Sequence, residues 1–169
     1  MHMKKNTGFT LIEVLVALGI FSIGALGLGK LMMVSVKSNG TAYMRSQATA
    51  LSYAMLDYMR ANRPETLQGP ASGYSMPALS ASAPAGATAL DCATNACTGN
   101  QLALYDLARW YAQLKDPNNG LPGGLASIVL TQINGQTSVT VTVQWDDSIS
   151  QQALQENVTP VSIAVTSVL

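Results

Sequence analysis

The feature that most constrains this chain is a long apolar segment close to its N-terminus. From Phe9 to the next basic residue, Lys30, the only charged residue is Glu13. As an α-helix with a rise of about 1.5 Å per residue, this segment is roughly 31 Å long, close to the roughly 30 Å thickness of a bilayer's hydrocarbon core. A pair of lysines precedes it, so the positive-inside rule keeps the N-terminus cytoplasmic. The sequence therefore predicts a single transmembrane helix over about 9–30.

The composition indicates that apolar residues face lipid or partner proteins in addition to forming one hydrophobic core. Hydrophobic residues make up 48% of the chain and charged residues 11%, well below the usual quarter. The net charge is zero, but from Glu65 onward only Arg109 and Lys115 are basic, against seven acidic residues. Such an acidic half offers no basic face to a phosphate backbone, so we expect no nucleic-acid partner.

A cleaved signal peptide is the ordinary alternative to a retained membrane helix. It requires a small-x-small cleavage site at the far end of the apolar segment. Gly27-Leu28-Gly29 is a poor version of such a site. We therefore favour a retained helix, and a mature chain beginning near Lys30 would establish the alternative.

The start of the apolar segment resembles the processing site of type IV prepilins. A short basic leader, Lys4-Lys5-Asn6-Thr7, ends at Gly8, Phe9 follows, and Glu13 is the fifth residue after that junction. The resemblance implies that residues 1–8 are a prepilin leader peptide. It further implies that a membrane-embedded prepilin peptidase cuts between Gly8 and Phe9 and then N-methylates Phe9. Glycine suits this position because it has no side chain to hinder close approach.

The resemblance also gives Glu13 a role in intersubunit assembly. The residue lies about 6 Å inside the membrane edge, where an acid costs somewhat less than the about 2.5–3.5 kcal/mol of a central position. Cleavage creates an ammonium group at Phe9, and in a staggered filament the carboxylate of one subunit can meet the amine of the next. Pairing of Glu13 with its own Phe9 amine, one helical turn away, is the alternative.

The helix is predicted to continue past the membrane, so that one long helix occupies 9–63. Beyond Lys30, small and apolar residues recur at spacings of three and four along one face: Met44, Ala48, Leu51, Met55 and Tyr58. Ser52 falls off this face. Arg63-Pro64 ends the element, because proline disfavours helix in the residue before it. A membrane anchor followed by an ordinary core helix predicts the same pattern, so the pattern supports the architecture and not a filament.

Residues 64–99 are interpreted as a connector that contains a disulfide loop. Composition shifts to Gly, Pro, Ser and Ala from Gln68 to about Leu90 without any periodicity, which is typical of a surface connector. Cys92 and Cys97 follow and are the only cysteines. In an oxidising periplasm we expect them to form a disulfide, worth about 2 kcal/mol in the chain-entropy model. Two free thiols are the alternative.

The remaining residues, 100–169, are predicted to form a small head. A helix is expected from Asn100 to about Leu114. Three strands are expected at Ser127–Ile133, Thr137–Trp145 and Val161–Val168, the first two joined by a hairpin turn at Asn134-Gly135. The predicted fold class is therefore α+β: a long N-terminal α-helix, half transmembrane and half amphipathic, packed on a small antiparallel β-sheet head, which is a pilin-like architecture.

The sequence does not favour an enzyme. The only histidine, His2, lies in the leader, so the processed chain lacks the base of Ser-His-Asp and Cys-His sites and has no histidine metal ligand. Asp146-Asp147 could bind a cation, but a solvated turn is the simpler interpretation. Gly120–Gly124 lacks the lysine of a phosphate-binding loop. We expect no catalytic residue, metal site or cofactor, and a membrane-anchored periplasmic enzyme remains a remote alternative.

Within the prepilins, the chain resembles the minor pilins known as type IV pilus modification protein PilV. The stretches that carry the resemblance are Gly24-Ala25-Leu26-Gly27-Leu28, Arg45-Ser46-Gln47-Ala48, Met59-Arg60-Ala61-Asn62-Arg63 and a strand that ends in Gln144-Trp145. Most of them fall in the first sixty-odd residues. Major pilins usually carry a proline in the apolar segment, and this chain has none there.

This resemblance implies a non-catalytic subunit of low abundance. It is expected in the inner membrane with its head in the periplasm, and then in the pilus at the cell surface. The expected partners are prepilin peptidase, other minor pilins, the major pilin and a tip adhesin, and the minor-pilin complex is expected to initiate pilus assembly. A minor pseudopilin of a type II secretion system is the nearest alternative.

Overall fold

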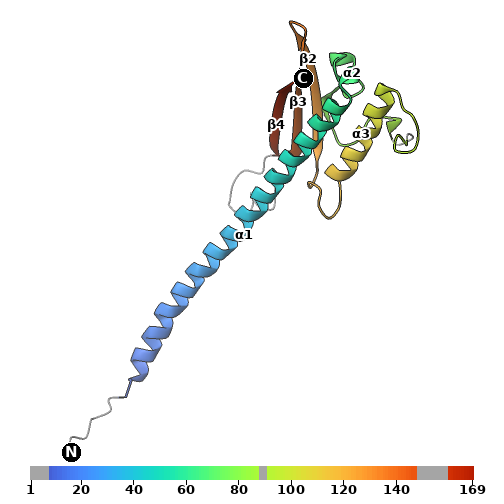
Figure 1. Ribbon diagram of the computed structural model, residues 1–169. Coiled ribbons are helices and arrows are strands. Elements are labelled where there is room, and N and C mark those ends of the chain that lie inside the picture. Colours follow the sequence, from blue (N-terminus) through green and yellow to red (C-terminus); the bar gives the residue numbers. More distant parts are fainter. Residues whose placement is uncertain (1–7, 88–90, 148–159) are drawn as a thin grey trace, which may run out of the picture. The chain divides into compact units, whose positions relative to one another are not determined.

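The computed structural model of the chain describes residues 8–87, 91–147 and 160–169. The described chain divides into two units, Met1–Asn39 and Gly40–Leu169, which are taken in turn. Helix α1 (Leu11–Ala61) begins in the first unit and ends in the second (Figure 1).

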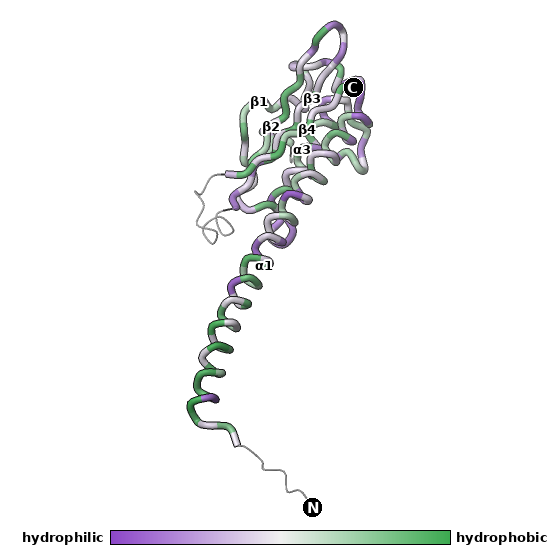
Figure 2. The backbone as a smooth tube through the Cα atoms, turned by 90° about the vertical axis from the view of Figure 1, so that its left-hand side faces the viewer, coloured by the Kyte–Doolittle hydropathy of each residue, from purple (hydrophilic) through white to green (hydrophobic). Residues whose placement is uncertain are grey.

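In the first unit, α1 is apolar on all sides. Its residues are all exposed from Leu11 through Val36, and Figure 2 shows this part mostly in hydrophobic colouring. Among the described residues, α1 is the one helix long and apolar enough to cross a membrane. The helix begins two residues after the predicted Phe9, because the Thr10 carbonyl accepts the first helical hydrogen bonds, from the amides of Glu13 and Val14.

In the second unit, α1 becomes a core helix. Its buried residues are Ala48, Leu51, Ser52, Met55, Leu56 and Met59. The spacing predicted this face, but the prediction that Ser52 lies off it was wrong. The buried face is wider than a single row of side chains, and Ser52 satisfies its hydroxyl by donating to the Ala48 carbonyl at 2.8 Å.

Helix α1 ends near the predicted position, although Arg63, the residue before the proline, is itself helical. The helix ends at Ala61, and a short helix α2 (Arg63–Thr66) follows at once, with proline in its first turn. Proline lacks an amide hydrogen, and the first amides of a helix need no helical acceptor. The break between the helices falls at Asn62, whose φ of −105° and ψ of 48° are not helical, and Pro64 suits the first turn of α2.

Within the described residues, the sheet has four strands rather than the expected three. The strands are β1 (Met76–Ser80), β2 (Leu125–Ile133), β3 (Gln136–Trp145) and β4 (Val161–Val168). All neighbours are antiparallel, in the order β1-β2-β3-β4. The predicted hairpin joins β2 to β3: Asn134 and Gly135 adopt φ values of 54° and 79°, as this tight turn requires.

β1 overturns the prediction of a featureless connector between Gln68 and Leu90. A single 3-10 turn (Gly69–Ala71) precedes it, and β1 then pairs with β2. Its sequence, with Pro77 in second place, lacks the apolar alternation of a strand. Proline is tolerated in an edge strand, and the pairing with β2 makes this segment a strand.

Helix α3 (Gly99–Leu114) and the second part of α1 cover the same face of the sheet (Figure 1). The capping box at Thr98 and Gln101 fixes the start of α3. The indole of Trp110 donates to the Leu51 carbonyl at 2.8 Å, and the hydroxyl of Tyr111 donates to the Ala126 carbonyl at 3.2 Å. The predicted α+β architecture, a long helix packed on an antiparallel sheet, is confirmed.

Candidate processing and assembly site

The junction of Gly8 and Phe9 lies just before α1 and has no helical structure. The Phe9 side chain is 82% exposed, and a Cβ added to Gly8 would meet no atom within 4 Å. A peptidase must bind its substrate with the scissile bond accessible, and helical hydrogen bonds would oppose that. Among the described residues, the Gly8–Phe9 peptide bond takes part in no helical hydrogen bond.

Glu13 occupies the first turn of α1, with its side chain exposed. A carboxylate here interacts favourably with the helix dipole, typically by 0.3–1 kcal/mol, which helps to explain an acid in an apolar segment even without a partner. Phe9, Glu13, Ala17 and Phe21 share one side of the helix, where with Val14 and Leu18 they line a shallow apolar groove of about 600 Å³.

The predicted partners of Glu13 both require cleavage. In the uncut chain the Phe9 nitrogen is an uncharged amide, whereas cleavage would turn it into an ammonium group. Among the described residues, the one ion pair is between Arg60 and Asp57. Pairing of Glu13 with Phe9 of a neighbour, or with its own Phe9, therefore stays a prediction.

Cys92 and Cys97 form a disulfide, with their Cα atoms 5.6 Å apart. Asp91 organises the loop that the disulfide closes. Its carboxylate accepts from the Thr94 hydroxyl at 2.7 Å and from the Ala93 amide at 3.1 Å. These hydrogen bonds, that from Thr94 foremost, lower the pKa of Asp91 below its ordinary value. The loop is therefore held both by the disulfide and by the hydrogen bonds that Asp91 accepts.

The most connected polar group in the head was missed by sequence reasoning. We call it the junction cluster, and its members are Asn62, Glu65, Tyr74, Asn100 and Asp106. It joins the end of α1, the segment before β1 and the start of α3. Asn and Asp are common in surface turns, and Glu65 and Tyr74 belong to no recognisable motif, so no local pattern distinguishes these five. Only the fold brings them together.

Glu65 and Asn62 anchor the junction cluster. Glu65 is 4% exposed, and its carboxylate accepts from the Gly73 amide and the Gln68 side chain, both at 2.8 Å. The Asn62 side chain donates to the Gly99 carbonyl at 2.7 Å. The buried carboxylate is thus satisfied by neutral donors, which indicates a structural role rather than a catalytic one.

The prediction of a solvated turn at Asp146-Asp147 was wrong for Asp147. This residue is 3% exposed, and one carboxylate oxygen accepts from the Thr41 hydroxyl at 3.1 Å. Its other oxygen and the Trp145 indole nitrogen have no hydrogen-bond partner among the described residues. Within those residues, no three potential His, Cys, Asp or Glu ligands lie together as a metal site would require.

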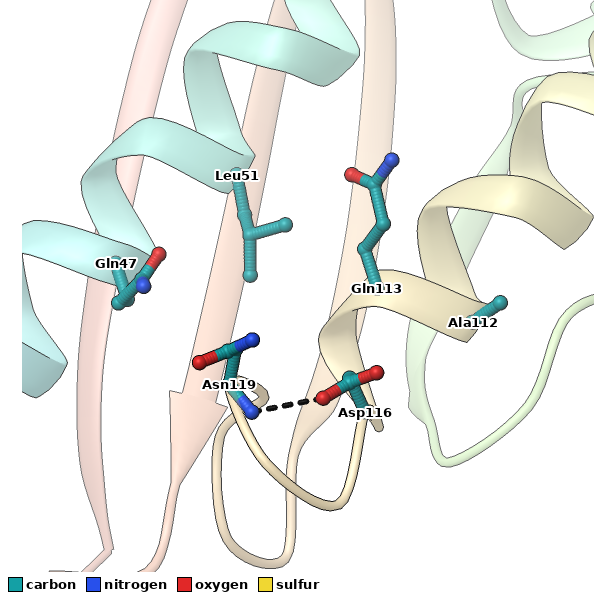
Figure 3. Close-up of a pocket in the computed structure, with 6 residues that line it drawn as sticks. All are labelled: Gln47, Leu51, Ala112, Gln113, Asp116 and Asn119. Carbon is teal, nitrogen blue, oxygen red and sulfur yellow. Dashed lines mark hydrogen bonds between the residues drawn. The ribbon is translucent and has the colours of Figure 1, made fainter.

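An open hollow of about 400 Å³ lies between α1, α3 and the loop that follows α3 (Figure 3). Its lining residues are Gln47, Leu51, Ala112, Gln113, Asp116 and Asn119. The Asp116 carboxylate already accepts from the backbone amides of Asn118 and Asn119, at 2.9 and 2.8 Å. It therefore shapes the loop, and the other polar residues that line the hollow, Gln47, Gln113 and Asn119, are uncharged amides.

Comparison with known proteins gives one finding. Residues 3–29 match the protein-family model described as the prokaryotic N-terminal methylation motif. Comparison with curated proteins yields no match, and comparison with solved structures yields none either. The matched residues include Gly8, Phe9 and Glu13, so the N-terminus of this chain is that of a type IV pilin-like or pseudopilin-like protein.

Proposed function

We propose that this chain is a minor pilin of a type IV pilus, closest in kind to PilV. The observation that carries the proposal is the methylation motif over residues 3–29. Three features support it: an exposed Gly8–Phe9 junction before the helix, an acid in the first helical turn, and an apolar helix that suits membrane anchoring.

On this proposal, prepilin peptidase cuts after Gly8 on the cytoplasmic side and N-methylates Phe9. The processed subunit remains in the inner membrane until assembly, with the α+β head in the periplasm. It then joins other minor pilins in a complex that initiates pilus assembly and enters the pilus with the major pilin, near a tip adhesin. Glu13 pairs with the new Phe9 ammonium of the adjacent subunit.

Mass spectrometry of the protein from its native host tests the processing step. We expect a chain that begins at N-methylated Phe9. Gly8→Val should block cleavage, and because a Cβ at Gly8 meets no atom within 4 Å, the block cannot be attributed to misfolding. Gly19→Ala, where a Cβ is equally unobstructed, should be processed normally. A mature chain beginning near Lys30 would establish signal-peptide cleavage and overturn the proposal.

A minor pseudopilin of a type II secretion system carries the same kind of N-terminal motif. The two roles differ in the filament that the subunit enters. Recovery of the processed chain with sheared pili and pilus minor pilins supports the pilus. Recovery only with secretion pseudopilins, from a gene that lies among secretion genes, would assign the chain to the secretion system instead.

A further inference from the structure

The chain contains three Asn-Gly pairs, Asn39-Gly40, Asn119-Gly120 and Asn134-Gly135. In such a pair the backbone nitrogen of the glycine can attack the side-chain carbonyl of the asparagine, because glycine has no side chain to hinder the approach. The attack requires a glycine amide that is free to move toward the asparagine side chain. An amide that donates a hydrogen bond must first break that bond, and the three pairs differ in this respect.

Asn39-Gly40 lies within helix α1. Amides in the interior of an α-helix donate to the carbonyl four residues earlier, so the Gly40 amide is bound within the helix. Attack on Asn39 would require the helix to open at this point and to lose several hydrogen bonds together. This pair is therefore protected by secondary structure.

Asn119-Gly120 lies in the loop after α3, where Asp116 holds both residues. The Asn119 amide donates to the Asp116 carboxylate and the Gly120 amide donates to the Asp116 carbonyl, both at 2.8 Å. A Cβ added to Gly120 would lie 2.5 Å from that carbonyl oxygen, so the backbone is closely packed here. The Asn119 side chain is exposed, but the glycine amide beside it is bound.

Asn134-Gly135 forms the tight turn between β2 and β3, and both residues are exposed. In a two-residue hairpin turn the residues on either side make the hydrogen bonds that close the turn, and here these are Ile133 and Gln136. Within the described chain the Gly135 amide donates no hydrogen bond. A Cβ added to Gly135 would meet no atom within 4 Å, so the amide is neither bound nor crowded.

We propose that Asn134 is a site of spontaneous deamidation, selected over Asn39 and Asn119 by the hairpin turn. The Gly135 nitrogen bonds to Cγ of Asn134, and the side-chain nitrogen leaves as ammonia with the proton that the Gly135 amide gives up. The resulting five-membered succinimide then adds one water molecule, which opens either of its two carbonyl groups. The product is an aspartyl or an isoaspartyl residue at position 134, and the reaction needs no oxidant, reductant or enzyme.

The modification places a negative charge in a part of the chain that has none. No charged residue occurs between Asp116 and Asp146, the stretch that contains β2 and β3. Either product adds a carboxylate at the exposed end of this hairpin. The isoaspartyl product also adds a methylene group to the main chain. Because loop length fixes the register of a hairpin, this product opposes the pairing of Ile133 with Gln136.

Peptide mapping by mass spectrometry, on full-length protein incubated in detergent in a mildly alkaline buffer, tests the assignment. Chymotrypsin separates the three pairs, because Tyr43 follows the first pair and Leu125 and Leu130 lie between the other two. In the folded protein, Asn134 should convert about tenfold faster than the other two asparagines, which corresponds to one hydrogen bond that must break. In the chymotryptic peptides, which have no fold, the three should convert at similar rates.

A rate at Asn134 that does not exceed the rate at Asn119 in the folded protein would overturn the proposal. Asp116→Ala is the matched variant: it removes the carboxylate that holds the Asn119 amide, so conversion at Asn119 should rise while conversion at Asn134 stays unchanged. An unchanged rate at Asn119 would also overturn the proposal, because restraint of the amide would then not select the site.

Circular dichroism decides whether Asp116→Ala is folded, and if it is not, the comparison of sites within the wild type decides alone. None of these outcomes affects cleavage at Gly8, so the proposed function is tested separately.

Discussion

The phenolic hydroxyl of Tyr74 donates a 2.6 Å hydrogen bond to a carboxylate oxygen of Asp106. Burial raises the pKa of Asp106 above its ordinary value, although the hydrogen bond from Tyr74 and the charge of Arg109 offset part of this effect. Burial, reinforced by the neighbouring carboxylate, also raises the pKa of Tyr74. Tyr74 therefore stays protonated and remains a donor.

This relationship predicts a pH dependence of stability. Because the pKa of Asp106 is higher in the folded than in the unfolded chain, its contribution to the free energy of unfolding is fully present below the ordinary pKa of 3.8. The contribution is lost as pH rises through the folded-state pKa. Asp106→Asn keeps an oxygen acceptor for Tyr74 but does not titrate. The stability of the wild type relative to this variant should fall as the pH rises above the ordinary pKa of 3.8.

Urea unfolding of the full-length protein in detergent at several pH values measures this difference. Asp57→Asn removes an exposed carboxylate on α1 and serves as the control for a general effect of charge. A stability difference between wild type and Asp106→Asn that is constant with pH would contradict the assignment.

Replacement of glycine by alanine should change the free energy of unfolding in opposite directions at Gly99 and Gly40. A Cβ on Gly99 would lie 3.1 Å from the Glu65 carboxylate, which its hydrogen bonds hold in place. Gly99→Ala should therefore lower the free energy of unfolding, by about 1 kcal/mol. A Cβ on Gly40, in α1, would meet no atom within 4 Å. Gly40→Ala should raise stability by up to about 1 kcal/mol through helix propensity.

Denaturant unfolding of both variants, side by side with the wild type, is the measurement. If Gly99→Ala stabilises the protein as much as Gly40→Ala does, then the junction cluster yields to the added methyl group and does not constrain the start of α3.

The disulfide between Cys92 and Cys97 should stabilise the head without any catalytic role. Removing both cysteines, as Cys92→Ser with Cys97→Ser, should lower the free energy of unfolding by about 2 kcal/mol, since the closed loop is short. Thiol labelling of the unreduced, unfolded protein isolated from cells should give no reaction. Two reactive thiols per chain would mean that the bond does not form in the cell.

Glu13→Gln should separate membrane insertion from assembly. Insertion and cleavage need no charge at Glu13, and a neutral amide is easier to bury than an ion, so both should proceed. If the chain is a minor pilin as proposed, its incorporation into the minor-pilin complex should fall, because the Phe9 ammonium of a neighbour would lose its partner in a dry interface. Co-purification of the processed variant with other pilins, at matched expression, measures this. Equal recovery would favour pairing of Glu13 with its own Phe9.

The elements that could be predicted from the sequence are those whose information is local. The apolar segment that includes Glu13 identifies itself by length and composition, because helix rise and bilayer thickness are fixed quantities. The Asn134-Gly135 turn and the alternation along Thr137–Trp145 predict a hairpin, because the turn geometry and the strand period involve only neighbouring residues. The motif around Gly8 is likewise contiguous.

Tertiary structure decided the features that depend on residues far apart in sequence. β1 is a strand because β2 pairs with it, although its own sequence, which contains Pro77, does not predict a strand. Asp147 is buried because Thr41, 106 positions away, supplies a hydroxyl donor. The bond between Tyr74 and Asp106 joins the segment before β1 to α3 across 32 positions of sequence. Local patterns report conformational preference and burial of one face, whereas these contacts exist only after the sheet and both helices have come together.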